Sequence, residues 1–331
     1  MNLYLGIFLI LIFTGLALYA RLGKWLKGLG FTFMVFAFAS CAFTFPAVFT
    51  SWCGFELKRA IIPLVQLILF GMGMTLSFAD FKRVLKMPRA VLVGVGLQFL
   101  IMPFMGFMCT KIFGLEGQVA AGLILIGSCP GGVASNVIVY LARGNVPLSV
   151  TLTACSTIIS PLMTPLAMKL LAGTYVPIAF LPMMLSILEM VILPLVAGIL
   201  IYRYLPRLAK VLVRVLPSLA MLSICVIISI TVALSRGDLL KIGLALLGAA
   251  ACHNTLGYLL GYYGARLFGM NRRDSQTVAI EVGIQNGGMA TGLAFNVLHS
   301  SQAALGAATF GPWSAVSSSV LASWWRKNEK I

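Results

Sequence analysis

Two short polar interruptions, CPGGVASN at residues 129–136 and EVGIQNGG at residues 281–288, each lie in the middle of a strongly apolar run. Pro-Gly-Gly and Gly-Gly leave backbone groups unpaired, and in lipid each such group costs several kcal/mol unless it lines a polar cavity. A tolerated kink is the simpler explanation, but one proline would suffice for that. Two breaks at matching positions instead predict two broken helices that cross near the membrane midplane and form a site there.

The regions around the breaks have the composition of a membrane protein. Only 10% of the 331 residues are charged, against roughly 25% in an ordinary soluble domain, and the mean hydropathy is +1.02. A helix needs about 20 apolar residues to cross a bilayer. The sequence predicts an all-α polytopic protein with eleven such runs, near residues 2–20, 29–50, 60–78, 90–113, 118–141, 147–171, 177–202, 215–235, 239–267, 275–300 and 302–325.

Lys and Arg residues gather in short clusters between these runs, as they do in the cytoplasmic loops of membrane proteins. With the loop after the first run inside the cell, 18 of the 24 basic residues are cytoplasmic, and so is the C-terminus. The distribution of these basic residues therefore predicts an orientation in the cell membrane. The net charge of +16 does not indicate a nucleic-acid partner. The six basic residues on the outer side are Lys58, Arg59, Lys111, Lys169, Arg236 and Lys241.

The runs divide into an extra helix and two halves. The first run has basic residues after it and no small-residue cleavage site, so residues 1–27 are predicted to form an extra N-terminal transmembrane helix and not a signal peptide. Residues 28–325 then form a ten-helix domain, with one repeat at 28–171, a second at 177–325, and a cytoplasmic tail from residue 326 to 331. Five spans per half invert the second repeat, which is a common plan of secondary transporters.

Of the eight acidic residues, only Glu189 and Glu281 fall well inside apolar runs, where a carboxylate is expensive and usually functional. Glu281 lies at the second break near Gln285, while Ser135 and Asn136 lie at the first. Together with exposed carbonyls, these side chains could supply hard oxygen ligands to a small cation. For the isolated Glu189, snorkelling, pairing with a base and protonation are all open alternatives.

Other polar residues inside the runs carry weaker predictions by themselves. Gln98 alone would be read as a hydrogen bond between helices. Ser149 and Thr153 stand one turn apart on one helix face, and alone they would be bonded back to their own helix. His253 and Asn254 are assigned by default to packing or to bonds between helices.

The sequence contains no enzyme motif. It has no acidic pair for metal-dependent lipid transfer and no HExxH, and the absence of a phosphate-binding GxxxxGK[ST] argues against ATP drive. The alternatives to a cation-coupled symporter are a proton-coupled antiporter, which needs a titrating carboxylate pair, and a metalloid efflux carrier that uses Cys129 as a soft ligand. A membrane-embedded hydrolase that pairs a serine with His253 or His299 is the third alternative.

At this point the residues resemble the bile acid:sodium symporter family. The matching stretches occur in order over residues 60–325, and together they are much more specific than any one alone. They are GMGMTL at 71–76, Gln98 with IMP at 101–103, CPGGVASN at 129–136, YLARGN at 140–145, LSV at 148–150, SPLMTP at 160–165, His253-Asn254 with GYLLG at 257–261, and IEVGIQN at 280–286.

The resemblance implies ten helices in two inverted repeats, in which a core bundle with both broken helices moves against a panel bundle. It also implies two sodium sites. The first would use Ser135, Asn136, Ser149, Thr153 and Glu281, and the second would use Gln98, Glu281, Gln285 and the carbonyls of Val282 and Ile284. The substrate would lie at the crossing, near Gly132, Val133 and Asn286.

These features together predict sodium-coupled symport of a small organic anion, either bile-acid-like or a small carboxylate, across the cytoplasmic membrane by alternating access. Na⁺ is the coupling ion, lipid is the solvent, and no cofactor is expected. Two Na⁺ around one carboxylate leave about one positive charge, which favours an anion as third partner. The sequence departs from the family at Val133, where bacterial relatives often have Thr, at residues 313–315, and in its first 20 residues.

Overall fold

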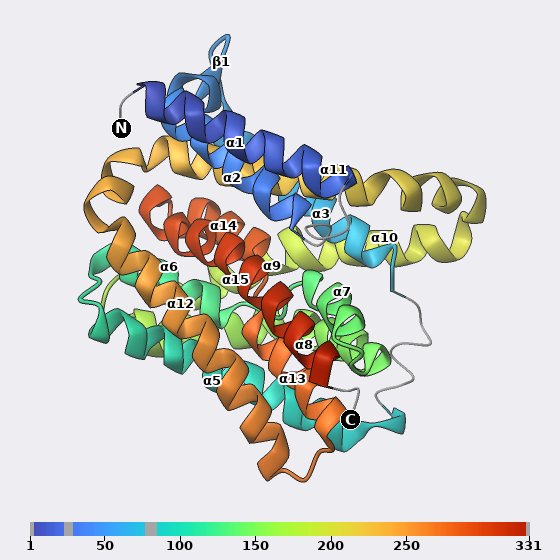
Figure 1. Ribbon diagram of the computed structural model, residues 1–331. Coiled ribbons are helices and arrows are strands. Elements are labelled where there is room, and N and C mark those ends of the chain that lie inside the picture. Colours follow the sequence, from blue (N-terminus) through green and yellow to red (C-terminus); the bar gives the residue numbers. More distant parts are fainter. Residues whose placement is uncertain (1–2, 23–28, 77–84, 329–331) are drawn as a thin grey trace.

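A computed structural model describes residues 3–22, 29–76 and 85–328, and these residues form an almost entirely helical protein (Figure 1). Of the predicted cytoplasmic clusters, Lys24, Lys27, Lys82, Arg83 and Lys330 lie outside the described residues. The helices are α1 (Leu3–Leu22), α2 (Gly30–Thr44), α3 (Ile61–Gly73), α5 (Pro88–Ile112), α6 (Gly117–Ser128), α7 (Ala134–Leu141), α8 (Val146–Ala167), α9 (Phe180–Ile187), α10 (Leu193–Tyr204), α11 (Pro206–Leu234), α12 (Arg236–Leu267), α13 (Arg272–Gly283), α14 (Gly287–Asn296) and α15 (Ser301–Asn328).

Short elements complete the chain. Two 3₁₀ turns, Pro46–Phe49 and Leu57–Ala60, flank a small antiparallel hairpin of β1 (Ser51–Trp52) and β2 (Phe55–Glu56) between α2 and α3. Two π-helical segments interrupt the long spans: Met168–Ala172 continues α8, and Leu188–Ile192 joins α9 to α10.

Every predicted apolar run contains helix, so the all-α polytopic class is confirmed. Within the described residues, six helical stretches are long and apolar enough to cross a membrane, and they are Leu3–Ala20, Pro88–Ile112, Val146–Ala172, Phe180–Tyr204, Pro206–Leu234 and Arg236–Leu267. The runs at 118–141 and 275–300 are each divided into two shorter helices at the predicted breaks. The boundaries of the two repeats stay a prediction.

Three boundaries differ from the predicted runs for identifiable reasons. Helix α2 ends at Thr44 because Pro46 follows, and the residue before a proline avoids helical geometry. Helix α11 begins at Pro206, well before the predicted start at 215. A proline is well suited to the first turn of a helix, and the basic residues that follow it are helical although they precede the apolar run. Helix α15 continues to Asn328 and so includes the start of the predicted tail.

The helices pack in two groups. One contains α2, α3, α9–α10 and α11, and α1 lies along α2 on its outer side (Figure 1). The other contains α5, α6–α7, α8, α12, α13–α14 and α15, so both broken helices belong to it. We call these groups the panel and the core, which matches the predicted division into two bundles.

At one end of the core, loops that are predicted to lie on the same side of the membrane lie together. At one end, Arg89 Nη2 donates a hydrogen bond to the Phe268 carbonyl at 2.7 Å, and Arg273 Nε donates to the Arg143 carbonyl at 3.2 Å. Three of the predicted cytoplasmic loops therefore meet at one end of the core. Which face of the membrane this end occupies stays a prediction.

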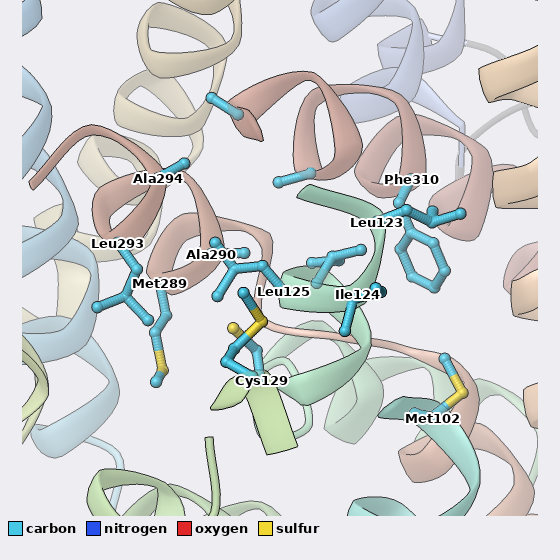
Figure 2. Packing of buried hydrophobic residues seen from close by; sticks show 14 of the residues in the cluster. Met102, Leu123, Ile124, Leu125, Cys129, Met289, Ala290, Leu293, Ala294 and Phe310 are labelled. Carbon is cyan, nitrogen blue, oxygen red and sulfur yellow. The ribbon is translucent and has the colours of Figure 1, made fainter. Parts of the chain in front are cut away.

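The centre of the core is built around the first half of each broken helix. In α6 every residue from Val119 to Ser128 is buried, and in α13 the same holds from Ser275 to Gly283. A helix that is buried on all sides lies in the middle of a protein. Apolar side chains of α5, α6, α14 and α15 interlock there, and among them Met102, Leu123, Met289 and Phe310 are labelled in Figure 2.

Small residues allow α6 and α15 to pack with their backbones in contact. A Cβ atom on Gly122 would lie 2.8 Å from Ala303 Cα, and its nearest neighbour would be the Ala303 carbonyl oxygen. We therefore expect Gly122→Ala to lower the free energy of unfolding by about 1–3 kcal/mol, the usual cost of overpacking. The thermal midpoint of the detergent-purified protein measures this. Gly96 on α5 has open space around it, so Gly96→Ala is the matched control, and equal midpoints would contradict the packing.

Candidate functional site

The two breaks lie against each other. The segment between α6 and α7 pairs antiparallel with the segment between α13 and α14, through Gly131 and Gln285. The Gly132 N–H donates to the Ile284 carbonyl at 3.0 Å, and the Asn286 N–H donates to the Pro130 carbonyl at 3.0 Å. Each break therefore satisfies backbone groups of the other, and the prediction that the broken helices meet is confirmed.

The glycines of the first break are required by this close approach. A Cβ on Gly132 would lie 2.7 Å from the Gln285 carbonyl oxygen, and one on Gly131 would lie 3.0 Å from Glu281 Oε2. Neither glycine has a positive φ, so the requirement is for space and not for an unusual backbone conformation. The Pro-Gly-Gly sequence thus allows two backbones to pair where side chains would separate them.

Carbonyls at the ends of the half-helices are held by side chains of neighbouring long helices. Thr164 Oγ1 on α8 donates to the Ser128 carbonyl at 2.7 Å, and Gln98 Nε2 on α5 donates to the Cys129 carbonyl at 3.0 Å. Asn254 Nδ2 on α12 donates to the Gly283 carbonyl at 2.8 Å. The Asn254 bond is of the interhelical kind predicted for that residue, whereas no such capping role was expected of Thr164.

The Glu281 carboxylate is buried among hydroxyl groups from α7 and α8. Ser135 Oγ donates to Oε1 at 2.6 Å, Ser149 Oγ also donates to Oε1, and Thr153 Oγ1 donates to Oε2 at 2.7 Å. Asn136 joins the same cluster, because its Oδ1 accepts from Ser149 Oγ at 2.7 Å. All five residues predicted for the first sodium site are therefore brought together.

This cluster contains more hydrogen-bond acceptors than protons. A serine hydroxyl has one proton, yet the Ser149 hydroxyl lies within hydrogen-bond distance of both Asn136 Oδ1 and Glu281 Oε1. The ion pairs found within the described residues involve only Glu56, so Glu281 has no basic partner there. A buried carboxylate without a counter-charge is costly. A small cation among these oxygens would supply the counter-charge and would also contact the acceptor oxygens that lack a proton.

The residues predicted for the second sodium site form an adjoining group. Gln98 Nε2 donates to Gln285 Oε1 at 2.7 Å, and Gln285 Nε2 donates to the Val282 carbonyl at 2.5 Å. Gln98 Oε1 is buried and has no hydrogen-bond partner within the described part of the chain. Gln98 and Glu281 also line a cavity of about 10 Å³, which is the size of one water-sized sphere. An unsatisfied oxygen beside a carboxylate suits a cation.

Three residues were predicted to contact the substrate. Gly132 takes part in the crossing itself, and Val133 immediately precedes α7. Asn286 precedes α14, and its Oδ1 accepts from the Met289 N–H at 3.0 Å. This leaves the amide nitrogen of Asn286 available to a ligand, close to the positive N-terminal ends of α7 and α14.

Other candidate groups lie apart from these clusters. Glu189 is exposed on the π-helical segment between α9 and α10, and its backbone carbonyl accepts from Gln66 Nε2 at 3.4 Å. Cys129 is fully buried in the apolar cluster of Figure 2, which is a poor place for a metalloid ligand. His253 Nε2 lies 2.8 Å from the Met102 carbonyl, and His253 Nδ1 has no hydrogen-bond partner within the described residues. The alternatives built on Cys129 and His253 gain no support from these positions.

Comparisons with known proteins agree with the geometry. A model of the sodium bile acid symporter family matches residues 62–242, a range that contains the α7 and α8 residues predicted for the first sodium site but ends before Glu281. An uncharacterized sodium-dependent transporter, YocS of Bacillus subtilis (strain 168), is 37% identical over 303 residues and 92% of each chain. The probable sodium/metabolite cotransporter BASS1 of Arabidopsis thaliana, a chloroplastic protein, is 35% identical over 264 residues, which are 80% of this chain and 66% of the relative.

Two glycines of the breaks offer a direct test of the crossing. Gly132→Ala would force the backbones apart, because the new methyl group would lie 2.7 Å from a carbonyl oxygen. A Cβ on Gly287 would lie 3.9 Å from the Ala307 carbonyl, an ordinary contact. We expect Gly132→Ala to lower stability by about 1–3 kcal/mol and Gly287→Ala to change it by less than about 0.5 kcal/mol. Thermal unfolding in detergent measures both, and indistinguishable midpoints would refute the paired geometry.

Proposed function

The chain belongs to the sodium bile acid symporter family, and on that premise we propose that it carries a small organic anion together with Na⁺ across the cell membrane by alternating access. The observation that carries this proposal is the buried Glu281 carboxylate, which accepts hydrogen bonds from hydroxyls of α7 and α8 and has no basic partner within the described residues. Two Na⁺ ions would occupy the two oxygen groups that share Glu281.

Sodium binding would complete the crossing electrostatically. Glu281 belongs to the second broken helix, whereas Ser135 and Asn136 belong to the first and Ser149 and Thr153 to α8. A cation that is bound by all of them would hold three helices together, in addition to the backbone pairing at the break. Oxygen ligands from side chains and unwound carbonyls are typical of coupling ions in such broken-helix transporters.

The substrate would bind where the two second half-helices begin. The N-termini of α7 and α14 each carry about half a positive charge, and the two Na⁺ ions leave about one net positive charge beside Glu281. An anion with its negative group near Gly132, Val133 and Asn286 would neutralise this charge. Binding of the anion would thus depend on prior binding of sodium, which is what couples the two fluxes.

Movement between outward- and inward-open states would take place between core and panel. Both oxygen groups and the crossing belong to the core, so the core can move without taking its own ligands apart. If two Na⁺ ions accompany one monovalent anion, each cycle moves one net charge, which gains about 2.3 kcal/mol per 100 mV of membrane potential.

Uptake into proteoliposomes tests this function directly. Labelled organic anions are supplied with an inward Na⁺ gradient, with K⁺ in place of Na⁺, or with a pH gradient. We expect sodium-dependent uptake by the wild type and its loss in Glu281→Gln, because removing one partner of a buried charge pair costs about 3 kcal/mol or more, about a hundredfold in sodium affinity.

Glu189→Gln is the matched control, because Glu189 is the other carboxylate in an apolar run but lies outside both oxygen groups. It should retain sodium-dependent uptake. Uptake that follows the pH gradient and ignores Na⁺ would replace sodium coupling by proton coupling at Glu281. Equal losses in the two variants would show that the oxygen groups around Glu281 are not the coupling site.

A further inference from the structure

A chain of hydrogen bonds runs from α15 through α12 to the second break, and it uses none of the predicted sodium ligands. Ser317 Oγ on α15 donates to Asn254 Oδ1 at 2.6 Å, and Asn254 Nδ2 donates to the Gly283 carbonyl at 2.8 Å. The Tyr258 hydroxyl lies 3.3 Å from Ser317 Oγ. The direction of the amide is determined by chemistry, because a carbonyl can only accept and therefore requires the NH₂ side of Asn254.

The Gly283 carbonyl, at which this series of hydrogen bonds ends, lies next to two carbonyls of the proposed second sodium site. Gly283 is the last residue of α13, and it lies between Val282 and Ile284, whose carbonyls belong to the proposed second sodium site. Ile284 leaves the helix with an extended backbone, at φ −103° and ψ 117°. Holding the Gly283 carbonyl fixes the plane of the peptide between the helix and this extended residue. The Val282 and Ile284 carbonyls belong to the two adjoining peptide planes, so holding the Gly283 carbonyl limits their directions through the backbone angles of Gly283 and Ile284, together with the donors Gln285 Nε2 and Gly132 N–H.

The backbones of α12 and α13 approach closely enough for Asn254 to reach this carbonyl. A Cβ on Gly257 would lie 3.2 Å from Gly283 Cα, and one on Gly261 would lie 3.2 Å from Ala279 Cα. A Cβ on Gly283 would clash with the ring of Tyr258. Asn254 itself is fully buried. The second break is therefore held against α12 along a seam of glycines, with Asn254 as its polar contact.

The first break has a corresponding device. Ser128 is the last residue of α6, as Gly283 is the last residue of α13, and its carbonyl accepts from Thr164 Oγ1 on α8 at 2.7 Å. In both broken helices, then, a buried polar side chain of a neighbouring unbroken helix holds the final carbonyl. Without these donors the carbonyls would have no hydrogen-bond partner in a part of the protein that water does not reach, which is costly.

We propose that Asn254 and Ser317 are positioning residues for the second sodium site. Asn254 holds the Gly283 peptide so that the Val282 and Ile284 carbonyls face the ion, and Ser317 fixes the rotation of the Asn254 amide. Neither residue contacts the ion. This inference rests on the proposed function, because it assigns residues that orient the ligands of one of the two proposed ion sites.

Sodium-dependent thermal stabilisation of the detergent-purified protein tests the proposal. NaCl is titrated against choline chloride at constant ionic strength, and each variant is compared with its own sodium-free midpoint, so that a general loss of stability does not imitate a loss of sodium binding. We expect Asn254→Ala to raise the half-saturating Na⁺ concentration about tenfold, the lower end of the range for outer partners of metal ligands.

Ser317 provides the milder variant and its rescue. Ser317→Ala should raise the half-saturating concentration by a smaller factor than Asn254→Ala, and Ser317→Thr, which keeps the hydroxyl, should restore it. Ser319→Ala is the control on the same helix, because among the described residues the Ser319 hydroxyl donates only to the Ala315 carbonyl of its own helix, at 2.8 Å. If Asn254→Ala does not fold, the Ser317 pair decides.

The outcomes separate this inference from the function on which it rests. In one outcome, sodium stabilises the wild type, and Ser317→Ala and Asn254→Ala differ from it only in their sodium-free midpoints. This result would overturn the positioning role and leave the symporter intact. A wild type that is not stabilised by sodium at all would overturn the sodium sites themselves. Raised half-saturation in both variants with an unchanged Ser319→Ala would establish the positioning chain.

Discussion

The structure depends on one constraint, which is that the backbone of each broken helix must find hydrogen-bond partners where water is scarce. The two breaks meet this constraint by pairing with each other through Gly131 and Gln285. The pairing explains why the first break contains two adjacent glycines, and why Thr164 and Asn254 reach across from unbroken helices to the last carbonyls. It also places Glu281, three residues before Ile284, directly beside the hydroxyls of α7 and α8.

The pairing satisfies the backbone but leaves a charge unsatisfied, and the proposed mechanism arises from this difference. Around Glu281 the hydroxyl protons are fewer than the acceptors, and Gln98 Oε1 has no partner within the described residues. Under the proposed function, a cation completes this site. Under the proposed function, the sodium ions are thus part of the fold of the crossing, and the anion completes their charge in turn.

The sequence predicted those features that lipid makes expensive. Glu281, Ser135 and Gln98 are polar side chains in apolar runs, and such residues are conspicuous because few positions in a membrane tolerate them. Ser317 was missed for the opposite reason. It lies in a run of three serines, and each could equally bond back to its own helix, as Ser319 does. Only the position of α12 beside α15 identifies the one that holds Asn254. Similarly, the start of α11 was missed because its first turns are too polar to resemble a span.

Selectivity for a particular anion has a different physical origin from anion binding itself. At the crossing, Asn286 uses its side-chain oxygen to bond the Met289 N–H, and Val133 has no hydroxyl. Under the proposed function, the groups that attract the negative charge are then the Asn286 amide nitrogen and the N-terminal amides of α7 and α14, which recognise charge without distinguishing one carboxylate from another. Discrimination would fall to the apolar panel surface that faces α14, where Ile68 Cδ1 lies 3.8 Å from the position of a Cβ on Gly288. Under the proposed function, the core supplies the charge and the coupling, while the panel determines the shape of the molecule that is carried.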